Sequence, residues 1–244
     1  MVMKMQCAGL PDPSGRIRVD DAVRARFPGF RLRVVLAFGL RNGASDDSSR
    51  ALLADSVARL RAGLRGRPAE HPHIAAWRAA YQAFGAKPSR YPCSAESLMQ
   101  RALKPGPHGS VPAINRLVDA YNAVSLGHAL PVGGEDFDRL RGDLVLRFAT
   151  GREGFDLPEA DGSAAGAEPG EVVWADDEGV TCRRWNWRQG RRTRLGEETV
   201  NAHFILEAIC PPYREAELDA AAERLSALLG ELGGASRLLT LRPF

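Results

Sequence analysis

The chain has 244 residues, enough for one large domain or two small ones with a sizeable buried core. Apolar residues make up 44% and charged residues 26%, as in an ordinary globular protein, and no run of about 18 apolar residues indicates a membrane-spanning helix. The formal net charge of +3 is too small to indicate a nucleic-acid partner by itself, and no DNA partner is expected.

The N-terminus and the cysteines predict a cytoplasmic protein. The first residues, MVMKMQCAGLPDPSG, contain no long apolar run and no small-residue cleavage site, so no signal peptide is expected. The cysteines form no C-x-x-C pair, and such a scatter favours reduced thiols over a disulfide framework. They are Cys7, Cys93, Cys182 and Cys210.

The first half of the chain predicts one strand followed by helices. Residues 1–29 contain several prolines and glycines and are expected to wrap the surface, and Phe30–Leu40 then predicts a strand with a buried centre. Apolar residues at helical spacing follow. They predict a helix capped by Asp46 or Asp47, a helix over His71–Phe84, a short helix capped by Ser94, and a helix over Ile114–Leu126.

The second half changes to the period of strands. The strands are expected at Leu144–Ala149, Glu171–Ala175, Val180–Trp187, Val200–Ile209 and Arg237–Leu241. Pro158–Gly170 is rich in Gly, Ala and acidic residues and is expected to be a mobile surface loop, and Glu215–Leu232 returns to helix. Helices first, then strands, then a helix predict an α+β fold of mixed sheets with flanking helices, in a single domain.

The helix predicted over Ile114–Leu126 carries a row of polar residues beside its apolar face. The side chains expected in the core are Ile114, Leu117, Val118, Tyr121 and Ser125. The polar row at the margin is Asn115, Asp119 and Asn122, and the residues expected toward solvent are Arg116, Ala120 and Ala123. Polar groups at such a margin need partners or a ligand. The residues alone favour capping of neighbouring loops over ligand contact.

An arginine-rich segment follows the strand at Val180. From 183 to 194 it has no acidic residue, and its arginines are Arg183, Arg184, Arg188, Arg191, Arg192 and Arg194. A phosphate-binding surface is one interpretation, because guanidinium groups bind phosphate oxygens in pairs, and a solvated hairpin tip is the other. Strand alternation would place Arg184, Asn186 and Arg188 on one face, with Trp185 and Trp187 in the core on the other.

Several familiar catalytic sites are not indicated. His71 and His73 are two residues apart, but no further His or Cys completes a zinc set at the usual spacing. The sequence has no P-loop, no G-x-G-x-x-G and no G-x-S-x-G. No cofactor and no metal is therefore expected.

Several segments, in order along the chain, resemble the editing domain of the phenylalanyl-tRNA synthetase β chain. That domain contains N-x-x-V-D-x-T-N followed by a loop that ends in F-D. This chain has Asn115, VDAYN and then FD at Phe137–Asp138; the later matching segments are Leu144–Phe155, Gly170–Trp185 and Glu198–Ala208. The chain is more similar still to the free-standing B3/B4 proteins, which share RRWNWRQ at Arg183–Gln189. The resemblance runs from about His71 to Leu232, which leaves residues 1–70 as an N-terminal extension.

The resemblance implies hydrolysis of the activated ester between an amino acid and the terminal ribose of tRNA. One positioned water and a held amino group are sufficient for that reaction. Asn122 matches the motif asparagine and Asn115 the asparagine ahead of it, so both are assigned to catalysis. Asp119 matches the motif aspartate and is expected to support the substrate site.

The later segments imply further contacts with the substrate and with tRNA. Glu207, in the segment Thr199–Ile209, is expected to bind the substrate amino group, with pairing to an arginine as the equal alternative. Thr199, at the start of the same segment, is also assigned to substrate binding. Asn186 is expected to line the pocket or grip phosphate. The arginines expected to bind tRNA are Arg184, Arg188, Arg191 and Arg192.

Two departures from the family pattern concern the chemistry. The editing loop of the synthetase contains a histidine, whereas Pro131–Gly134 reads PVGG here. The acidic residue that the family has near M-G-G is replaced by the basic RRWNWRQG segment. Trans-editing deacylation of mischarged aminoacyl-tRNA is the function favoured, and the alternatives are a tRNA-dependent aminoacyl transferase and an RNA-binding module without chemistry.

Overall fold

The computed structural model describes residues 15–106, 111–157 and 166–241, and it confirms the mixed α+β class. The helices are Asp21–Arg26 (α1), Asp47–Gly63 (α2), Pro72–Ala83 (α3), Ser94–Ala102 (α4), Arg116–His128 (α5) and Glu215–Glu231 (α6), with 3-10 turns at Pro68–Glu70 (η2) and Phe137–Arg139 (η3). The strands are Ile17–Val19 (β1), Phe30–Phe38 (β2), Val132–Asp136 (β3), Leu144–Phe148 (β4), Val172–Ala175 (β5), Val180–Arg183 (β6), Arg188–Gln189 (β7), Ala202–Ile209 (β8) and Arg237–Leu241 (β9).

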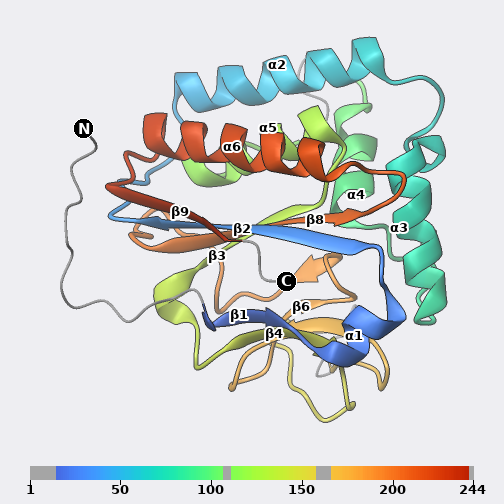
Figure 1. The fold of residues 1–244 in the computed structure, drawn as a ribbon. Helices are drawn as coiled ribbons and strands as arrows, with labels where there is room; N and C mark the ends of the chain where they lie inside the picture. The colour runs from blue at the N-terminus through green and yellow to red at the C-terminus, as the bar shows by residue number, and fades with distance from the viewer. Residues whose placement is uncertain (1–14, 107–110, 158–165, 242–244) are drawn as a thin grey trace.

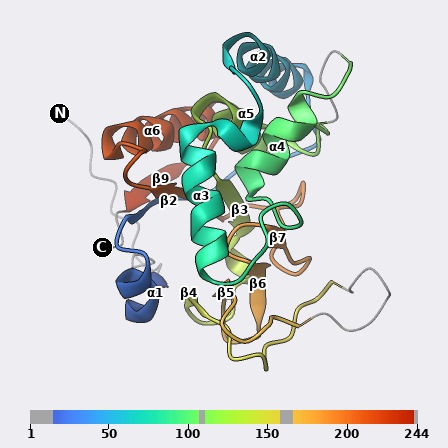
Figure 2. The same cartoon turned by 90° about the vertical axis from the view of Figure 1, so that its right-hand side faces the viewer.

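The strands form two sheets that face each other across an apolar layer. Sheet 1 has the order β1-β4-β5-β6-β7, and sheet 2 has the order β3-β8-β2-β9. Strand β1 pairs with β4 in parallel, and the other pairs are antiparallel. Helices α5 and α6 cover the outer face of sheet 2, α2 lies over α5, and α3 and α4 stand at one end of both sheets (Figures 1 and 2).

Strand alternation on β2 and β8 divides the core into two parts. On β2, Leu32 and Leu36 point toward sheet 1, while Val35 and Ala37 point toward α5 and α6. The layer between the sheets is centred on Trp185, whose indole is fully buried. Its ring centroid lies 4.8 Å from that of Phe27 and 5.1 Å from that of Trp77. These aromatic rings fix the distance between the sheets beside the candidate site.

The helix starts follow the capping residues in the sequence. Asp46 accepts a hydrogen bond from the Ser49 backbone N–H, and the Ser49 hydroxyl accepts one from the Asp46 N–H, which makes a capping box at the start of α2. Asn115 caps α5 by accepting a bond from the Val118 N–H at 3.0 Å. Ser94 does not cap its helix: it is the first residue of α4, and Cys93 stands at the cap position.

The structure corrects several expectations. Residues 17–26 form β1 and α1, and Val132–Asp136, expected as a loop, is the edge strand β3. Ala120 and Ala123 are buried because α2 covers the face of α5 that was expected toward solvent, whereas Ile114 precedes the helix and is 53% exposed. Residues 158–165 of the predicted mobile loop lie outside the described residues. In the described part of the chain, no helix is long and apolar enough to cross a membrane.

Candidate functional site

A cavity of ≈ 260 Å³ lies between the two sheets, at the end closed by α4 and α5. It brings together three of the residues predicted from sequence: Asn122, Asn186 and Glu207. They come from α5, from the turn between β6 and β7, and from β8. Segments distant in the sequence thus meet around one enclosed space with both polar and apolar walls, which is the usual character of a small-ligand site.

Strand β8 forms the floor of this cavity. Side chains alternate along a strand, so Phe204 and Leu206 pack toward the helices while His203, Ile205 and Glu207 line the cavity. The antiparallel register places Glu135 of β3 directly opposite His203, so the Glu135 side chain is on the same face. The floor therefore carries two carboxyl groups and an imidazole.

Glu207 is held by three N–H donors. One carboxylate oxygen accepts hydrogen bonds from the indoles of Trp174 and Trp185 at 3.0 and 3.1 Å, and the other accepts one from the Asn186 amide at 2.8 Å. Burial raises the pKa of Glu207 to about 7, although these donors favour the charged form and oppose the rise. Glu207 pairs with these amide and indole groups, not with an arginine.

The RRWNWR motif makes a tight turn that aims Asn186 at Glu207. Arg184 and Trp185 have φ of 44° and 66°, in the left-handed region, so the strand predicted to run to Trp187 ends at Arg183. The turn places Trp185 in the core. The Asn186 carbonyl oxygen accepts bonds from the Tyr81 hydroxyl at 2.9 Å and the Ser94 N–H at 3.3 Å. Asn186 therefore connects α3, α4 and the cavity floor.

Glu135 and His203 were not predicted as site residues. Both are buried, and Glu135 Oε2 lies 3.6 Å from His203 Nε2, beyond hydrogen-bond distance. Burial raises the pKa of Glu135 to about 7. Burial, with the nearby charge of Arg16, lowers the pKa of His203 to about 3, so the imidazole is neutral. The period of the strand predicted over Val200–Ile209 was a signal for His203, because it faces the same way as Glu207.

On α5, only Asn122 of the polar row reaches the cavity. Asn115 is buried at the helix start, and its amide donates to the Leu195 carbonyl. Asp119 is fully buried and accepts bonds from the Ser49 hydroxyl and the Ile114 N–H at 2.8 and 3.0 Å. Neither side chain lines the cavity, and both hold loops against α5. Their assignment to catalysis and substrate support stays an untested prediction.

Thr199 is also directed away from the cavity. It precedes β8, is buried, and donates its hydroxyl proton to the Asp136 carboxylate at 2.9 Å. The same hydroxyl accepts a hydrogen bond from the Gly196 N–H at 3.0 Å. These bonds stabilise the turn that leads into β8. Thr199 thus has a structural role and does not line the cavity, and its assignment to substrate binding stays an untested prediction.

The arginine-rich segment is divided between the interior and the surface. Arg184 is buried, bonded to Glu168 and stacked 3.8 Å from the Tyr91 ring centroid, so it does not present a free guanidinium to phosphate. Arg192 makes two bonds to the buried carboxylate of Asp176, at 2.9 and 2.7 Å. In this segment Arg191 and Arg194 are exposed, while Arg188 and Arg192 are half-buried. Of these four, Arg192 is the one paired with a buried carboxylate.

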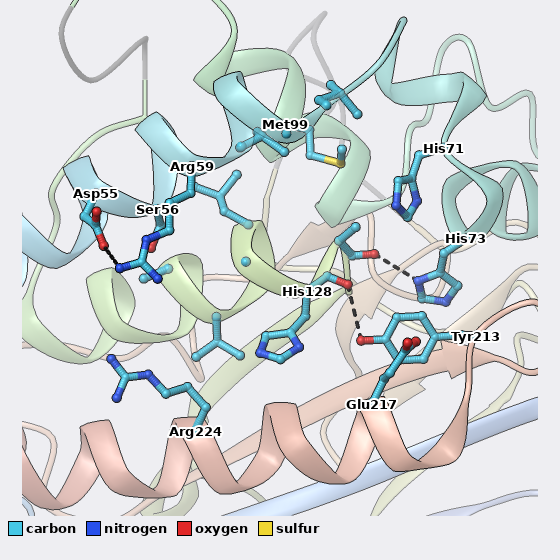
Figure 3. Close-up of a pocket in the computed structure, with 18 of the residues that line it drawn as sticks. Asp55, Ser56, Arg59, His71, His73, Met99, His128, Tyr213, Glu217 and Arg224 are labelled. Carbon is cyan, nitrogen blue, oxygen red and sulfur yellow. Dashed lines mark hydrogen bonds and ion pairs between the residues drawn. The ribbon is translucent and has the colours of Figure 1, made fainter.

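A larger cavity of ≈ 840 Å³ lies between α2, α5 and α6, and it contains none of the predicted site residues (Figure 3). Several of its polar groups are hydrogen-bonded or paired, although His71 Nδ1 is buried without a partner. His73 contacts the Ala129 carbonyl through Nδ1 and accepts from the Trp77 indole through Nε2, and Arg59 pairs with Asp55. The smaller cavity holds the buried carboxyl groups without cationic partners and three of the predicted residues, so we take it as the candidate functional site.

A family model identifies the family to which the chain belongs. The model of the B3/4 domain family matches residues 76–234. No curated protein matches the chain. Among solved structures, the chain is similar to an N-terminal fragment of the phenylalanyl-tRNA synthetase β-subunit from Pyrococcus horikoshii, with 14% identity and a TM-score of 0.42. The match covers 91% of this chain and 49% of the fragment, so the chain spans about half the length of that relative.

Proposed function

Because this chain belongs to the B3/4 domain family, we propose that it hydrolyses the ester of mischarged aminoacyl-tRNA in trans, with the cavity between the sheets as the active site. The observation that carries this proposal is the meeting of Asn122, Asn186 and Glu207 around one enclosed space. A volume of ≈ 260 Å³ suits an amino acid and part of a ribose better than a whole nucleotide.

The proposed reaction needs only water and the chain's own polar groups. The oxygen of a water held in the cavity attacks the ester carbonyl carbon, the bond from that carbon to the ribose oxygen breaks, and the ribose oxygen takes up a proton. The Asn122 amide orients the ester, and its N–H groups stabilise the negative charge that develops on the carbonyl oxygen. Asn186, fixed by Tyr81 and Glu207, is a positioning residue for this arrangement.

The proposed tRNA contacts are surface arginines near the cavity. Arg188 and Arg191 from the predicted set remain, and Arg194 takes the place of Arg184 and Arg192, whose guanidinium groups bind carboxylates of the protein. Arg101 is exposed on α4 and lines the cavity, so it is suited to the phosphate next to the terminal ribose. Together these side chains would lead the acceptor end of tRNA toward the opening.

A panel of aminoacyl-tRNAs, each labelled on the amino acid, tests the proposal. We expect release of free amino acid from at least one mischarged tRNA, and loss of that release in Asn122→Ala. Transfer of the label to an added amine instead of water would establish an aminoacyl transferase. Binding of tRNA without hydrolysis of any ester would refute the proposed reaction and show that the protein is an RNA-binding module without chemistry.

A further inference from the structure

The two carboxyl groups on the cavity floor lie at opposite ends of it. Glu135 is opposite His203 in the strand register, and Glu207 is further along β8 on the same face. At about 3.3 Å per residue, the Cα atoms of His203 and Glu207 are roughly 13 Å apart. Ile205 lies between them. The two carboxyl groups therefore act on different parts of any ligand.

At the other end, hydrogen bonds from the protein already satisfy the carboxylate of Glu207. Its two oxygens accept three hydrogen bonds from indole and amide groups, at distances between 2.8 and 3.1 Å. A carboxylate with three N–H donors is well satisfied and gains little from another. Its position explains the placement of Trp174, Trp185 and Asn186, which form part of the cavity wall. Glu207 is thus a scaffold for the wall.

The Glu135 end is open to a donor. Glu135 Oε2 and His203 Nδ1 are both buried, and neither has a hydrogen-bond partner. Glu135 and His203 are only 6% and 1% exposed, and both residues line the cavity. Buried acceptors without partners are costly, and native structures keep few of them. Two such atoms, on residues that lie opposite each other in the strand register and line the same cavity, indicate a position for a ligand group that donates hydrogen bonds.

We propose that Glu135 and His203 receive the ammonium group of the ligand, so that the cavity selects primary amines such as the α-amino group of an aminoacyl ester. An ammonium group has several N–H donors and no acceptor, which suits a carboxylate oxygen and the lone pair of a neutral imidazole. A hydroxyl group has one proton and would leave one acceptor unpartnered. The ester is part of the proposed function on which this inference rests, but recognition of the amine does not require catalysis.

The charges around Glu135 favour a cationic guest. The groups that face it are His203 on β8, Cys182 on β6, Tyr121 on α5, and beyond them Asp176, Arg192 and Arg194. Arg192 is bonded to Asp176 and Arg194 to the Gln189 carbonyl. Gln189, Thr181 and Thr193 are neutral donors that favour the charged form of Glu135, and Oε2 is left without a partner. Among the described residues that line the cavity, Arg101 carries the only guanidinium, on α4. Among the described residues no cation forms an ion pair with Glu135, so its carboxylate is available to a cationic ligand.

Calorimetry with matched small probes tests the assignment. The probes are phenylalaninamide and leucinamide, each compared with the corresponding amide that lacks the amino group. We expect wild-type protein near pH 7.4 to prefer the amino probe by about tenfold, the range of a charge-assisted hydrogen bond. Glu135→Gln should reduce this preference to about twofold or less. The matched control is Glu223→Gln on the exposed face of α6, which should keep the full preference.

Several results would overturn the assignment. One is loss of the preference in Glu207→Gln with full preference in Glu135→Gln, which would place the amine at Glu207. Another is equal affinity of both probes for wild-type protein, or no binding of any probe. If Glu135→Gln does not fold, wild-type protein alone can test the proposal. Its affinity for the amino probe must rise from about pH 6 to about pH 7.4, because Glu135 ionises over this range. A flat pH profile refutes the proposal. Selective amine binding without deacylation would refute the proposed hydrolysis alone.

Discussion

At the scale of single residues, the two asparagines at the start and in the middle of α5 have different surroundings. One is expected to serve catalysis and the other to stabilise the helix. Asn122 is partly exposed and lines the cavity, whereas Asn115 is buried and caps the helix. We expect Asn122→Ala to abolish deacylation while changing stability by no more than about 0.5 kcal/mol, as at most partly exposed positions. Activity and thermal unfolding of the same preparation measure both effects.

Asn115→Ala is the matched control for that variant. Loss of an N-cap costs about 1 kcal/mol, so its melting temperature should fall. Any deacylation that is lost should return at lower temperature, where the helix start re-forms. An Asn122→Ala protein that keeps full activity would remove Asn122 from the site. One that melts as low as Asn115→Ala would show that Asn122 also supports the fold.

Glu135 should make the protein less stable as the pH rises. Its pKa is raised by burial from 4.5 to about 7 in the folded protein, so folding favours the protonated form. The stability it contributes is fully present below about pH 4.5 and is lost as the pH rises to about 7, on the order of 3 kcal/mol. Glu135→Gln stays neutral and should therefore become more stable than wild type at about pH 8.

Urea unfolding of both proteins between about pH 5 and about pH 8 measures this difference. Part of the slope should remain in the variant, because the pKa of Glu207 is raised in the same direction. Parallel curves for wild type and Glu135→Gln would mean that the Glu135 carboxyl is solvated in the folded protein.

At the scale of elements, the hairpin of β6 and β7 presents three surface arginines. We expect the combined change of Arg188, Arg191 and Arg194 to alanine to weaken tRNA binding and to reduce the salt slope by about 3, since each lost phosphate contact removes about one. Filter binding at several salt concentrations gives affinity and slope together. Arg192 is left in place because the buried carboxylate of Asp176 would lose its partner.

The other arginine cluster supplies a control with the same change in charge. Arg59, Arg65 and Arg67 are exposed on and after α2, away from the hairpin. Their replacement by alanine should leave the salt slope within about one unit of wild type. Equal effects of the two triple variants would show that tRNA responds to net charge and that the hairpin is not a specific contact.

The turn between β6 and β7 depends on a buried ion pair. Glu171 accepts bonds from the Arg183 guanidinium at 3.1 and 2.9 Å and from the Arg184 N–H at 2.8 Å. Glu171→Ala would leave a buried guanidinium without this carboxylate, so we expect a loss of about 3 to 5 kcal/mol in the free energy of unfolding. Glu168→Ala removes an exposed partner of Arg184 and should cost no more than about 1 kcal/mol.

The elements that sequence predicted well have strong local signals. The helices at α2 and α6 and the strands at β2, β8 and β9 follow from capping residues and apolar period. Strand β3 was missed because VGGED is short and glycine-rich, and it becomes a strand only by pairing with β8. The turn at Arg184 was missed because non-glycine residues with positive φ have no local signal and are held by tertiary contacts.

Considering the whole molecule, the proposed reaction should not depend on a bound metal. An aminoacyl ester is already activated, and the described residues contain no group of three potential metal-binding side chains. Hydrolysis of a minimal aminoacyl-adenosine ester should therefore survive EDTA. Loss on whole tRNA alone would reflect folding of the RNA. Loss on the minimal ester, restored by zinc or manganese, would contradict the mechanism.

The sequence predicted only some of the residues that line the candidate site. Asn122, Asn186 and Glu207 lie in segments that resemble the family, and the resemblance predicted them as site residues. All three line the cavity. Glu135 and His203 meet only through the register of β3 and β8, which is set by packing over the whole of sheet 2. Asn115, Asp119 and Thr199 share motifs with the site residues, but the fold uses them to hold loops. Spacing along the chain does not distinguish these two uses.

The position of β2 has a consequence for how the protein is made. This strand lies between β8 and β9, so that Phe30 pairs with Ile209 and Val34 with Leu241. During synthesis, β2 leaves the ribosome long before either partner exists, with a nearly continuous apolar sequence and both edges unpaired. Sheet 2 therefore cannot form until β8 and β9 have been synthesised, and it relies on slow, long-range contacts. We expect nascent chains that stop before β8 to bind chaperones through Phe30–Phe38, and released full-length chains to lose that binding as the sheet closes.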